Sequence, residues 1–300
     1  MIWVSQILQG VLLGGYYALI ACGLSFMFGV MRIINLAHGD LAVLAGFLVW
    51  FIAGQTGINP FLALALVIPL MAALGWVLQR TMLERSLRAG ELVPLLSTFG
   101  LAIVIENLLF EQFGADTRSL APYIGGLSYD SLTIGGQIYL SYLGIIIFAV
   151  AVAILGGLHF FLGHTNLGRA IRATAEDIDT AELVGINSRA VYAAAAAIAL
   201  ATVAVGGAAL GMRATFAPYA GPAQLIFAFE AVVIGGLGSL WGTLAGGIAL
   251  GVAQNIGATI NTHGFLIAGH VVFLAFLALR PFLTSLNAKG RIKALLRRAA

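Results

Sequence analysis

The chain has 300 residues, of which 61% are hydrophobic and only 9% are charged, and its mean hydropathy is +1.02. Soluble domains carry about 25% charged residues, so this composition excludes an ordinary globular domain and indicates a membrane protein with several spans. The arginines behind the net charge of +3 are scattered, which excludes a concentrated nucleic-acid-binding patch. The single cysteine, Cys22, excludes an internal disulfide and a cysteine-based metal site.

Apolar runs long enough to cross a bilayer occur along the whole chain. The predicted spans are residues 4–29, 36–53, 60–79, 92–113, 138–162, 190–211, 223–240, 243–258 and 265–283. The first run is long enough to contain a break, and the seventh and eighth are short enough to be two spans or a re-entrant pair. The predicted fold class is an all-α polytopic membrane protein with about 8 to 10 transmembrane helices and broken, glycine-rich segments.

The basic residues predict the orientation of these spans. If the N-terminus lies outside, Arg118 and Arg213 are the only two of the 15 Lys and Arg residues that also lie outside. The positive-inside rule then places residues 163–189 and the C-terminus in the cytoplasm, and makes 114–136 the largest external loop. We expect one transmembrane domain over residues 1–300, with a first half (1–162), a second half (190–284) and a basic tail (285–300). Halves of five and four spans would be inverted, a common plan in transporters.

The first polar interruption reads GVMRIINLAHGD and lies between two apolar runs. Asn35, His38 and Gly39 suggest a broken or capped helix end at membrane depth, where polar groups usually face an interior or a cavity. His38 and Asp40 are compatible with a proton relay, but a metal site is disfavoured because no second histidine stands at ligand spacing and no cysteine is nearby. Glu106 and Glu230 are further candidate buried acids, which would either touch substrate or simply pair with an arginine.

The longest polar stretch, residues 165–189, reads TNLGRAIRATAEDIDTAELVGINSR. At helical period it predicts an amphipathic helix about five turns long over 167–184, begun by Thr165 or Asn166 and ended by Gly185. This helix is either a solvated connector or a docking helix for a cytoplasmic partner. In the second case, we expect a partner groove to cover Ile171, Ala175 and Ile178.

Glycines recur at four-residue spacing in the stretch FEAVVIGGLGSLWGTLAGGIALG, which covers residues 229–251. Such spacing allows helix backbones to pack closely without any role in transport. Alternatively, Gly235, Gly236 and Gly238 break the helix and expose backbone groups to a cavity. The residues predicted to border a substrate route are Asn35, His38, Gly39, Glu230, Gly235, Gly236 and Gly238.

Three motifs together resemble those of a known family, and they stand in the same order and at the same spacing as in that family. They are GLSFMFGVMRIINLAHGDLAVLAGF (23–47), GRAIRATAEDIDTAELVGIN (168–187) and AVVIGGLGSLWGTLAGG (231–247). The chain is similar over nearly its whole length to the permease subunits of branched-chain amino acid ABC importers, specifically to the shorter of the two paired permeases. The motifs are less specific for the solute, because related permeases carry urea, amides and other amino acids.

The resemblance implies a subunit of a larger transporter in the bacterial inner membrane. Its implied partners are a second homologous permease, two cytoplasmic ATP-binding subunits and a periplasmic solute-binding protein. The sequence has no GxxxxGK[ST] phosphate loop, so we expect neither an ATPase site, nor a cofactor, nor enzymatic activity in this chain. The residues that would couple it to an ATPase are Arg169, Ile171, Arg172, Ala175, Glu176, Ile178, Asp179 and Gly185.

Two other functions remain open from the residues alone. An ion-coupled secondary carrier would use Asp40, Glu106 or Glu230 as a titrating group, but it has no evident need for the cytoplasmic helix. An intramembrane enzyme built around His38 and Asp40 is disfavoured because no nucleophile and base stand at a recognisable spacing.

Overall fold

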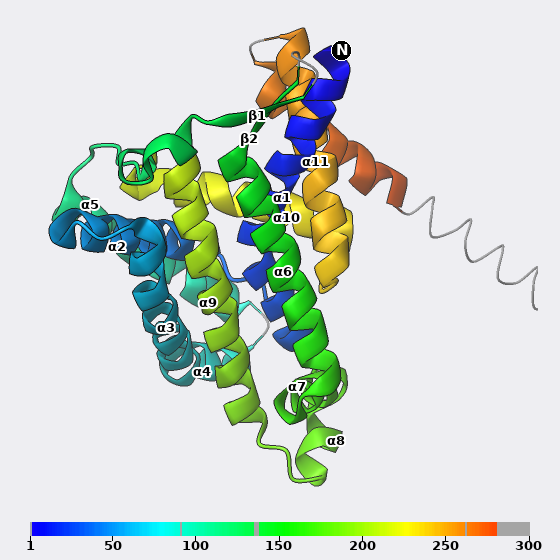
Figure 1. Cartoon of the computed structure of the whole chain (residues 1–300). Helices are drawn as coiled ribbons and strands as arrows, with labels where there is room; N and C mark the ends of the chain where they lie inside the picture. Colours follow the sequence, from blue (N-terminus) through cyan, green and yellow to red (C-terminus); the bar gives the residue numbers. More distant parts are fainter. Residues whose placement is uncertain (1, 91, 135–137, 262, 281–300) are drawn as a thin grey trace, which may run out of the picture.

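The structure is a computed structural model that describes the chain except residues 1, 91, 135–137, 262 and 281–300 (Figure 1). The described part is a helical bundle in which eight helices are long and apolar enough to cross a membrane, and a shorter apolar helix covers Gly264–Arg280. The protein is therefore an all-α, multi-pass membrane protein, as its composition predicts. The predicted basic tail, residues 285–300, lies outside the described residues.

Five of these long helices begin in the predicted first half, residues 1–162, and the first four of them precede the predicted loop 114–136. α1 (Ile2–Met31) is a single continuous helix, so the break allowed for in the first span is absent from its described length. α2 (His38–Thr56) follows a non-helical segment. α3 (Pro60–Leu78) continues through a π-helical turn, η1 (Gln79–Leu83), into α4 (Glu84–Ala89), and α5 (Val93–Phe113) follows.

The loop after α5 carries a small β-hairpin near the N-terminal end of α1 (Figure 1). Two short turns, η2 (Ala121–Tyr123) and η3 (Gly125–Ser128), precede β1 (Ser131–Ile134), which pairs antiparallel with β2 (Ile138–Ser141). The predicted span 138–162 was therefore wrong at its start. Ser141 ends the strand and caps α6 (Tyr142–His164) by accepting a hydrogen bond from Gly144 N at 3.3 Å.

Between the two predicted halves lie two short helices, α7 (Asn166–Glu176) and α8 (Ile178–Leu183), at the end of the molecule opposite the N-terminus (Figure 1). α9 (Ser188–Arg213) then runs back along the bundle, and η4 (Pro218–Ala220) leads into α10 (Gly221–Gly235). α11 (Leu240–Ile260) is separate from α10, so the seventh and eighth predicted spans are two helices and not one merged span.

α1 lies at the centre of the bundle and is mostly buried, whereas α3, α5 and α6 expose most of their residues. α1 packs most extensively against α11, where Gly10 and Gly14 face Gly247 and Gly251. A Cβ at Gly14 would lie 2.3 Å from the Cα of Ile248, so only glycine permits this crossing. The Tyr17 hydroxyl donates a hydrogen bond to Gln254 Oε1 across the same contact.

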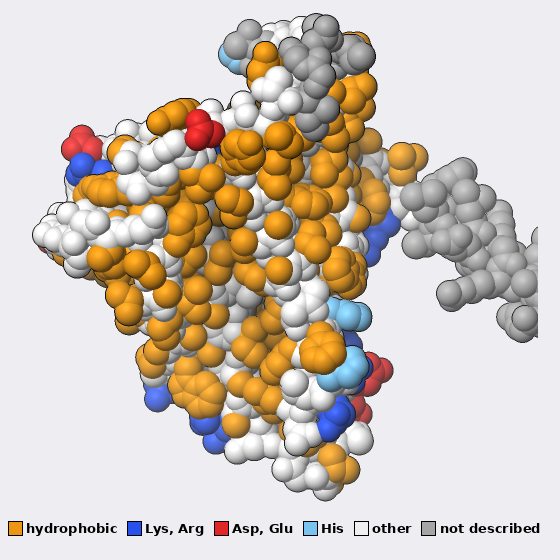
Figure 2. Space-filling view, in the orientation of Figure 1, with side chains coloured by type: hydrophobic (Ala, Val, Ile, Leu, Met, Phe, Trp, Pro, Cys, Tyr) orange, Lys and Arg blue, Asp and Glu red, His pale blue; other side chains and the backbone are white. Residues whose placement is uncertain are grey.

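The surface is apolar over most of the face shown in Figure 2, and charged side chains gather mainly towards its two ends. Exposed leucines, isoleucines and phenylalanines on α3 and α5 include Leu62, Leu66, Leu96 and Leu108. In a water-soluble protein such an apolar surface would favour aggregation. In a bilayer it faces the lipid tails.

Candidate functional site

The α7–α8 segment is helical on both sides of a break at Asp177. Thr165 caps α7, because its Oγ1 accepts a hydrogen bond from Gly168 N at 2.9 Å, as predicted. Gly185 follows α8 in the left-handed conformation with φ of 86°, also as predicted. The segment therefore begins and ends where the sequence places it.

The predicted five-turn helix over 167–184 is wrong in its middle. Asp177 has an extended backbone (φ −151°, ψ 113°) that separates α7 from α8. Its carboxylate accepts hydrogen bonds from Thr180 N at 3.1 Å and Thr180 Oγ1 at 2.9 Å, so it starts a new helix. The hydrogen bond from the Thr180 backbone N–H, with a second from its hydroxyl, lowers the pKa of the Asp177 carboxyl below its ordinary value.

The apolar stripe of α7 faces its own chain. Ile171 is 1% exposed, so the expectation that a partner groove covers this residue is wrong. Ile171, Arg172 and Ala175 border a narrow cleft of about 210 Å³ together with Gly29 of α1 and Gly238 of the α10–α11 turn. α7 thus packs against α1, and the cleft lies between α7 and the glycine turn.

The exposed apolar surface lies one helix further on, at the tip of α8. Ile178 is 42% exposed, Leu183 86% and Val184 72%. Sequence reasoning singled out Ile178 and missed Leu183 and Val184, whose signal was two adjacent apolar residues before the helix-ending Gly185. The other predicted coupling residues at this end, which are all exposed, are Arg169, Arg172, Glu176, Asp179 and Gly185.

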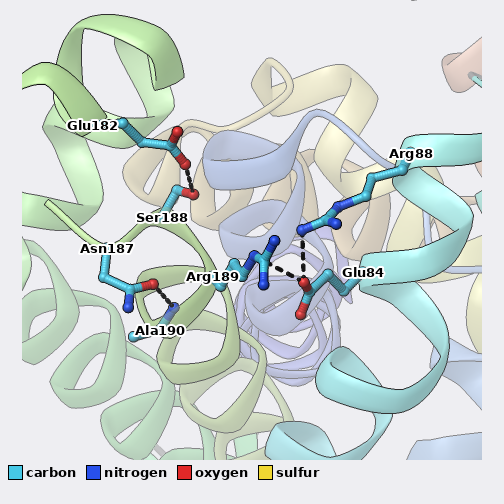
Figure 3. Close-up of polar contacts among 7 residues, drawn as sticks. All are labelled: Glu84, Arg88, Glu182, Asn187, Ser188, Arg189 and Ala190. Atoms are coloured by element: carbon cyan, nitrogen blue, oxygen red, sulfur yellow. Dashed lines mark hydrogen bonds and ion pairs between the residues drawn. The ribbon is translucent and has the colours of Figure 1, made fainter.

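A cluster of polar contacts ties this tip to the first half of the chain (Figure 3). Glu84 of α4 accepts from Arg88 Nη2 at 2.8 Å and pairs with Arg189 Nε of α9 at 3.1 Å. Beside it, Ser188 donates a hydrogen bond to Glu182 of α8. A cleft of about 430 Å³ lies between these contacts and Ile178, so α8 borders a hollow that reaches α4.

The polar residues before α2 lie inside the bundle. Asn35 is 2% exposed, and its Oδ1 accepts from Ala37 N at 3.0 Å just before the helix begins. His38 is fully buried, with Nε2 at 2.7 Å from the carbonyl oxygen of Ile20. Gly39 packs against the start of α10, where a Cβ would lie 1.9 Å from the oxygen of Gly221. The predicted helix end is confirmed, and a substrate role for these three residues stays a prediction.

Glu230 of α10 pairs with a histidine and not with an arginine. It is 2% exposed, and its Oε1 lies 2.5 Å from Nδ1 of His270 on the helix Gly264–Arg280. Among the described residues, no group hydrogen-bonds its second oxygen, Oε2. Sequence reasoning missed His270, because nothing in the chain order brings it to α10.

The α10–α11 turn shows both features considered for the glycine-rich stretch 229–251, a broken helix and close backbone packing. α10 ends at Gly235, and Gly236 and Gly238 have φ of 93° and 81°, so the helix is broken where predicted. Gly235 nevertheless packs on α11, since a Cβ there would lie 2.0 Å from the oxygen of Gly242. Of the three, Gly238 borders the cleft at α7.

The comparisons with known proteins agree over almost the whole chain. The family described as branched-chain amino acid transport system / permease component matches residues 6–279. The high-affinity branched-chain amino acid transport system permease protein BraD of Pseudomonas aeruginosa is 32% identical over 269 residues, covering 86% of this chain and 87% of its own. LivH of Escherichia coli, which has the same description, is 30% identical over 84% of this chain and 85% of its own. The probable LivH of Methanocaldococcus jannaschii is 26% identical over 90% of this chain and 87% of its own.

Proposed function

We propose that this chain, which belongs to the family of branched-chain amino acid transport system permease components, is the membrane-spanning subunit of an ABC importer. It would move branched-chain or related amino acids into the cell while separate ATP-binding subunits supply the energy. Its other partners would be a second homologous permease and a periplasmic solute-binding protein, as expected from the resemblance.

The observation that carries this proposal is the apolar tip of α8. Leu183 and Val184 are the most exposed large apolar residues of the α7–α8 segment. An apolar surface in water is unfavourable, so a protein partner should cover it. We propose that this partner is an ATP-binding subunit.

The proposed orientation puts the α7–α8 segment in the cytoplasm and the N-terminus in the periplasm. Figure 2 shows Lys and Arg side chains over the end of the molecule that carries α4, α7 and α8. The positive-inside rule assigns such an end to the cytoplasm. The hairpin β1–β2, near the opposite end, would then face the solute-binding protein.

The packing of α7 suggests how docking reaches the spans. A force on α8 passes into α7, which shares its cleft with the end of α1 and the turn at Gly238. The ion pair of Glu84 with Arg189 of α9 carries the same displacement to α4. The ATP-binding subunit would therefore move both halves of the permease from one contact.

A pair of charge substitutions tests this function. Ile178→Asp and Leu183→Asp each put a charge into the proposed contact, which should weaken docking by about 3 kcal/mol, or about a hundredfold. We expect the variants to insert and pair with the second permease but to lose co-purification of the ATP-binding subunit and solute-stimulated ATP hydrolysis. Leu132→Asp is the matched control for co-purification of the ATP-binding subunit, because Leu132 is 40% exposed and lies in the hairpin at the opposite end of the molecule from α8 (Figure 1).

Two outcomes would overturn the proposal. One is normal ATPase association and hydrolysis in both α8 variants. The other is solute uptake by the purified chain alone in vesicles, driven by an ion gradient without ATP, which would favour the ion-coupled secondary carrier.

A further inference from the structure

A pocket of about 350 Å³ lies at the hairpin end of the bundle, away from the α7–α8 segment. Its walls come from α1, α6, α9 and α11, and the hairpin β1–β2 adds Ser131 and Tyr139. Its volume falls within the range of small-molecule sites, about 300 to 1,000 Å³. One side is apolar, formed by Leu12, Leu13, Leu143 and Ile147.

The other side of the pocket carries one basic group, Arg213. Its guanidinium lies 5.1 Å from the ring centroid of Tyr16, and Tyr16 is held in turn because its hydroxyl donates to Gln224 Oε1 at 2.8 Å. Stacking on an aromatic ring orients a guanidinium without using its N–H donors. Arg213 is exposed, and no acidic side chain in the described ranges forms an ion pair with it.

Arg118, the other arginine expected on the outer side, is arranged differently. It lies 3.6 Å from Asp116 Oδ2, donates to the Phe113 carbonyl oxygen at 3.1 Å and stacks over Trp50 at 4.8 Å. Arg118 therefore binds groups of its own loop, Asp116 and the Phe113 carbonyl. The N–H donors of Arg213, in contrast, are available to a ligand in the pocket.

From this geometry we infer that the hairpin pocket is an entry site for a solute with a carboxylate next to an apolar side chain, and that Arg213 binds the carboxylate. The planar guanidinium matches a carboxylate with two parallel hydrogen bonds. The leucine and isoleucine side of the pocket then takes the apolar part of the solute. This inference rests on the proposed import function and adds to it the residue that recognises the acid group.

The test measures protection of a cysteine in the pocket and needs neither ATP nor the solute-binding protein. Ser131→Cys is introduced together with Cys22→Ala, and the permease is paired with its partner permease in phosphatidylcholine vesicles. We expect millimolar leucine to slow labelling by an impermeant thiol reagent, while leucine amide, which lacks the carboxylate, slows it at least tenfold less well.

Substitutions of Arg213 then assign the effect. Arg213→Gln should raise the leucine concentration needed for protection by about ten- to a hundredfold, the value of a charge-assisted hydrogen bond. Arg213→Lys keeps the charge and should lie between the two, which guards against a variant that only misfolds. Arg118→Lys is the matched control at the other outer arginine and should leave protection unchanged.

Three results would overturn the inference. Protection by the amide equal to that by leucine would remove the carboxylate contact, and unchanged protection in Arg213→Gln would remove the residue. Arginine-dependent protection by phosphatidylglycerol alone would assign the pocket to a lipid headgroup. Because ATPase docking at α8 is measured separately, each of these results can occur while the proposed transport function stands.

Discussion

Single glycines decide how closely these helices approach one another. Gly242 and Gly235 meet at the α10–α11 contact, and each would place a Cβ 2.0 Å from the carbonyl oxygen of the other. Gly246 lies one turn further on, where a Cβ would lie 2.1 Å from the oxygen of Ala231. The side chain that is missing at these positions is what allows backbone-to-backbone packing.

Gly242→Ala should therefore destabilise the protein. The added methyl group collides with backbone, which cannot rotate away, so we expect a loss of about 1 to 3 kcal/mol, typical of an overpacked contact. Thermal unfolding of the purified chain in detergent, followed by size-exclusion chromatography, measures it. Gly157→Ala in α6 is the control, because nothing lies within 4 Å of its Cβ position. Equal stability of the two variants would contradict the close approach.

The sequence predicted this type of contact but not its partners. Four-residue spacing marked Gly238, Gly242 and Gly246 on one edge and Gly247 and Gly251 on another. Which helix meets each edge depends on packing between distant segments. Gly10 and Gly14, which pack against Gly247 and Gly251, lie in an apolar run that carries no distinguishing pattern. Burial of Glu230 against His270 was hidden for the same reason, since their positions differ by 40 residues.

At the scale of elements, the α7–α8 boundary shows where periodicity misleads. Thr174, Ile178 and Ala181 keep helical spacing through Asp177, so the pattern reads as one helix although the backbone breaks. A local contact decides where the backbone breaks. The Asp177 carboxylate accepts a hydrogen bond from the backbone N–H of Thr180, three residues later, and so caps a new helix. Hydropathy located the long spans well because the bilayer length fixes them, while their ends depended on caps such as Ser141 and Asn187.

The cap at Asp177 predicts a pH dependence for α8. The pKa of this carboxyl is lowered in the folded state, so its contribution is present above the unfolded pKa, about 3.9, and is lost as pH falls through the folded value. We expect a spin label on Leu183→Cys to become more mobile as pH falls below about 4. Adding Asp177→Asn, which keeps the acceptor but cannot titrate, should remove that transition. Identical pH profiles for the two proteins would show that other acids hold α8 in place.

At the scale of the whole molecule, the proposed orientation makes the two ends chemically distinguishable. Leu183→Cys at the α8 tip and Tyr129→Cys in the outer loop are 86% and 77% exposed positions, and Cys22 is buried. In intact cells, an impermeant thiol reagent should label position 129 and spare position 183. Labelling of 183 without 129 would reverse the orientation.

The central position of α1 has a consequence for how the protein is made. The ribosome synthesises α1 first, yet the helix against which it packs most extensively, α11, begins at Leu240. Until α11 has left the ribosome, Gly10 and Gly14 have no backbone to meet and the Tyr17 hydroxyl lacks its acceptor, Gln254. For most of translation, α1 must therefore remain in the lipid, or beside the insertion machinery, without α11 packed against it. A chain truncated before α11 would keep most of its spans and still expose this unpaired surface, which makes it a substrate for membrane quality control.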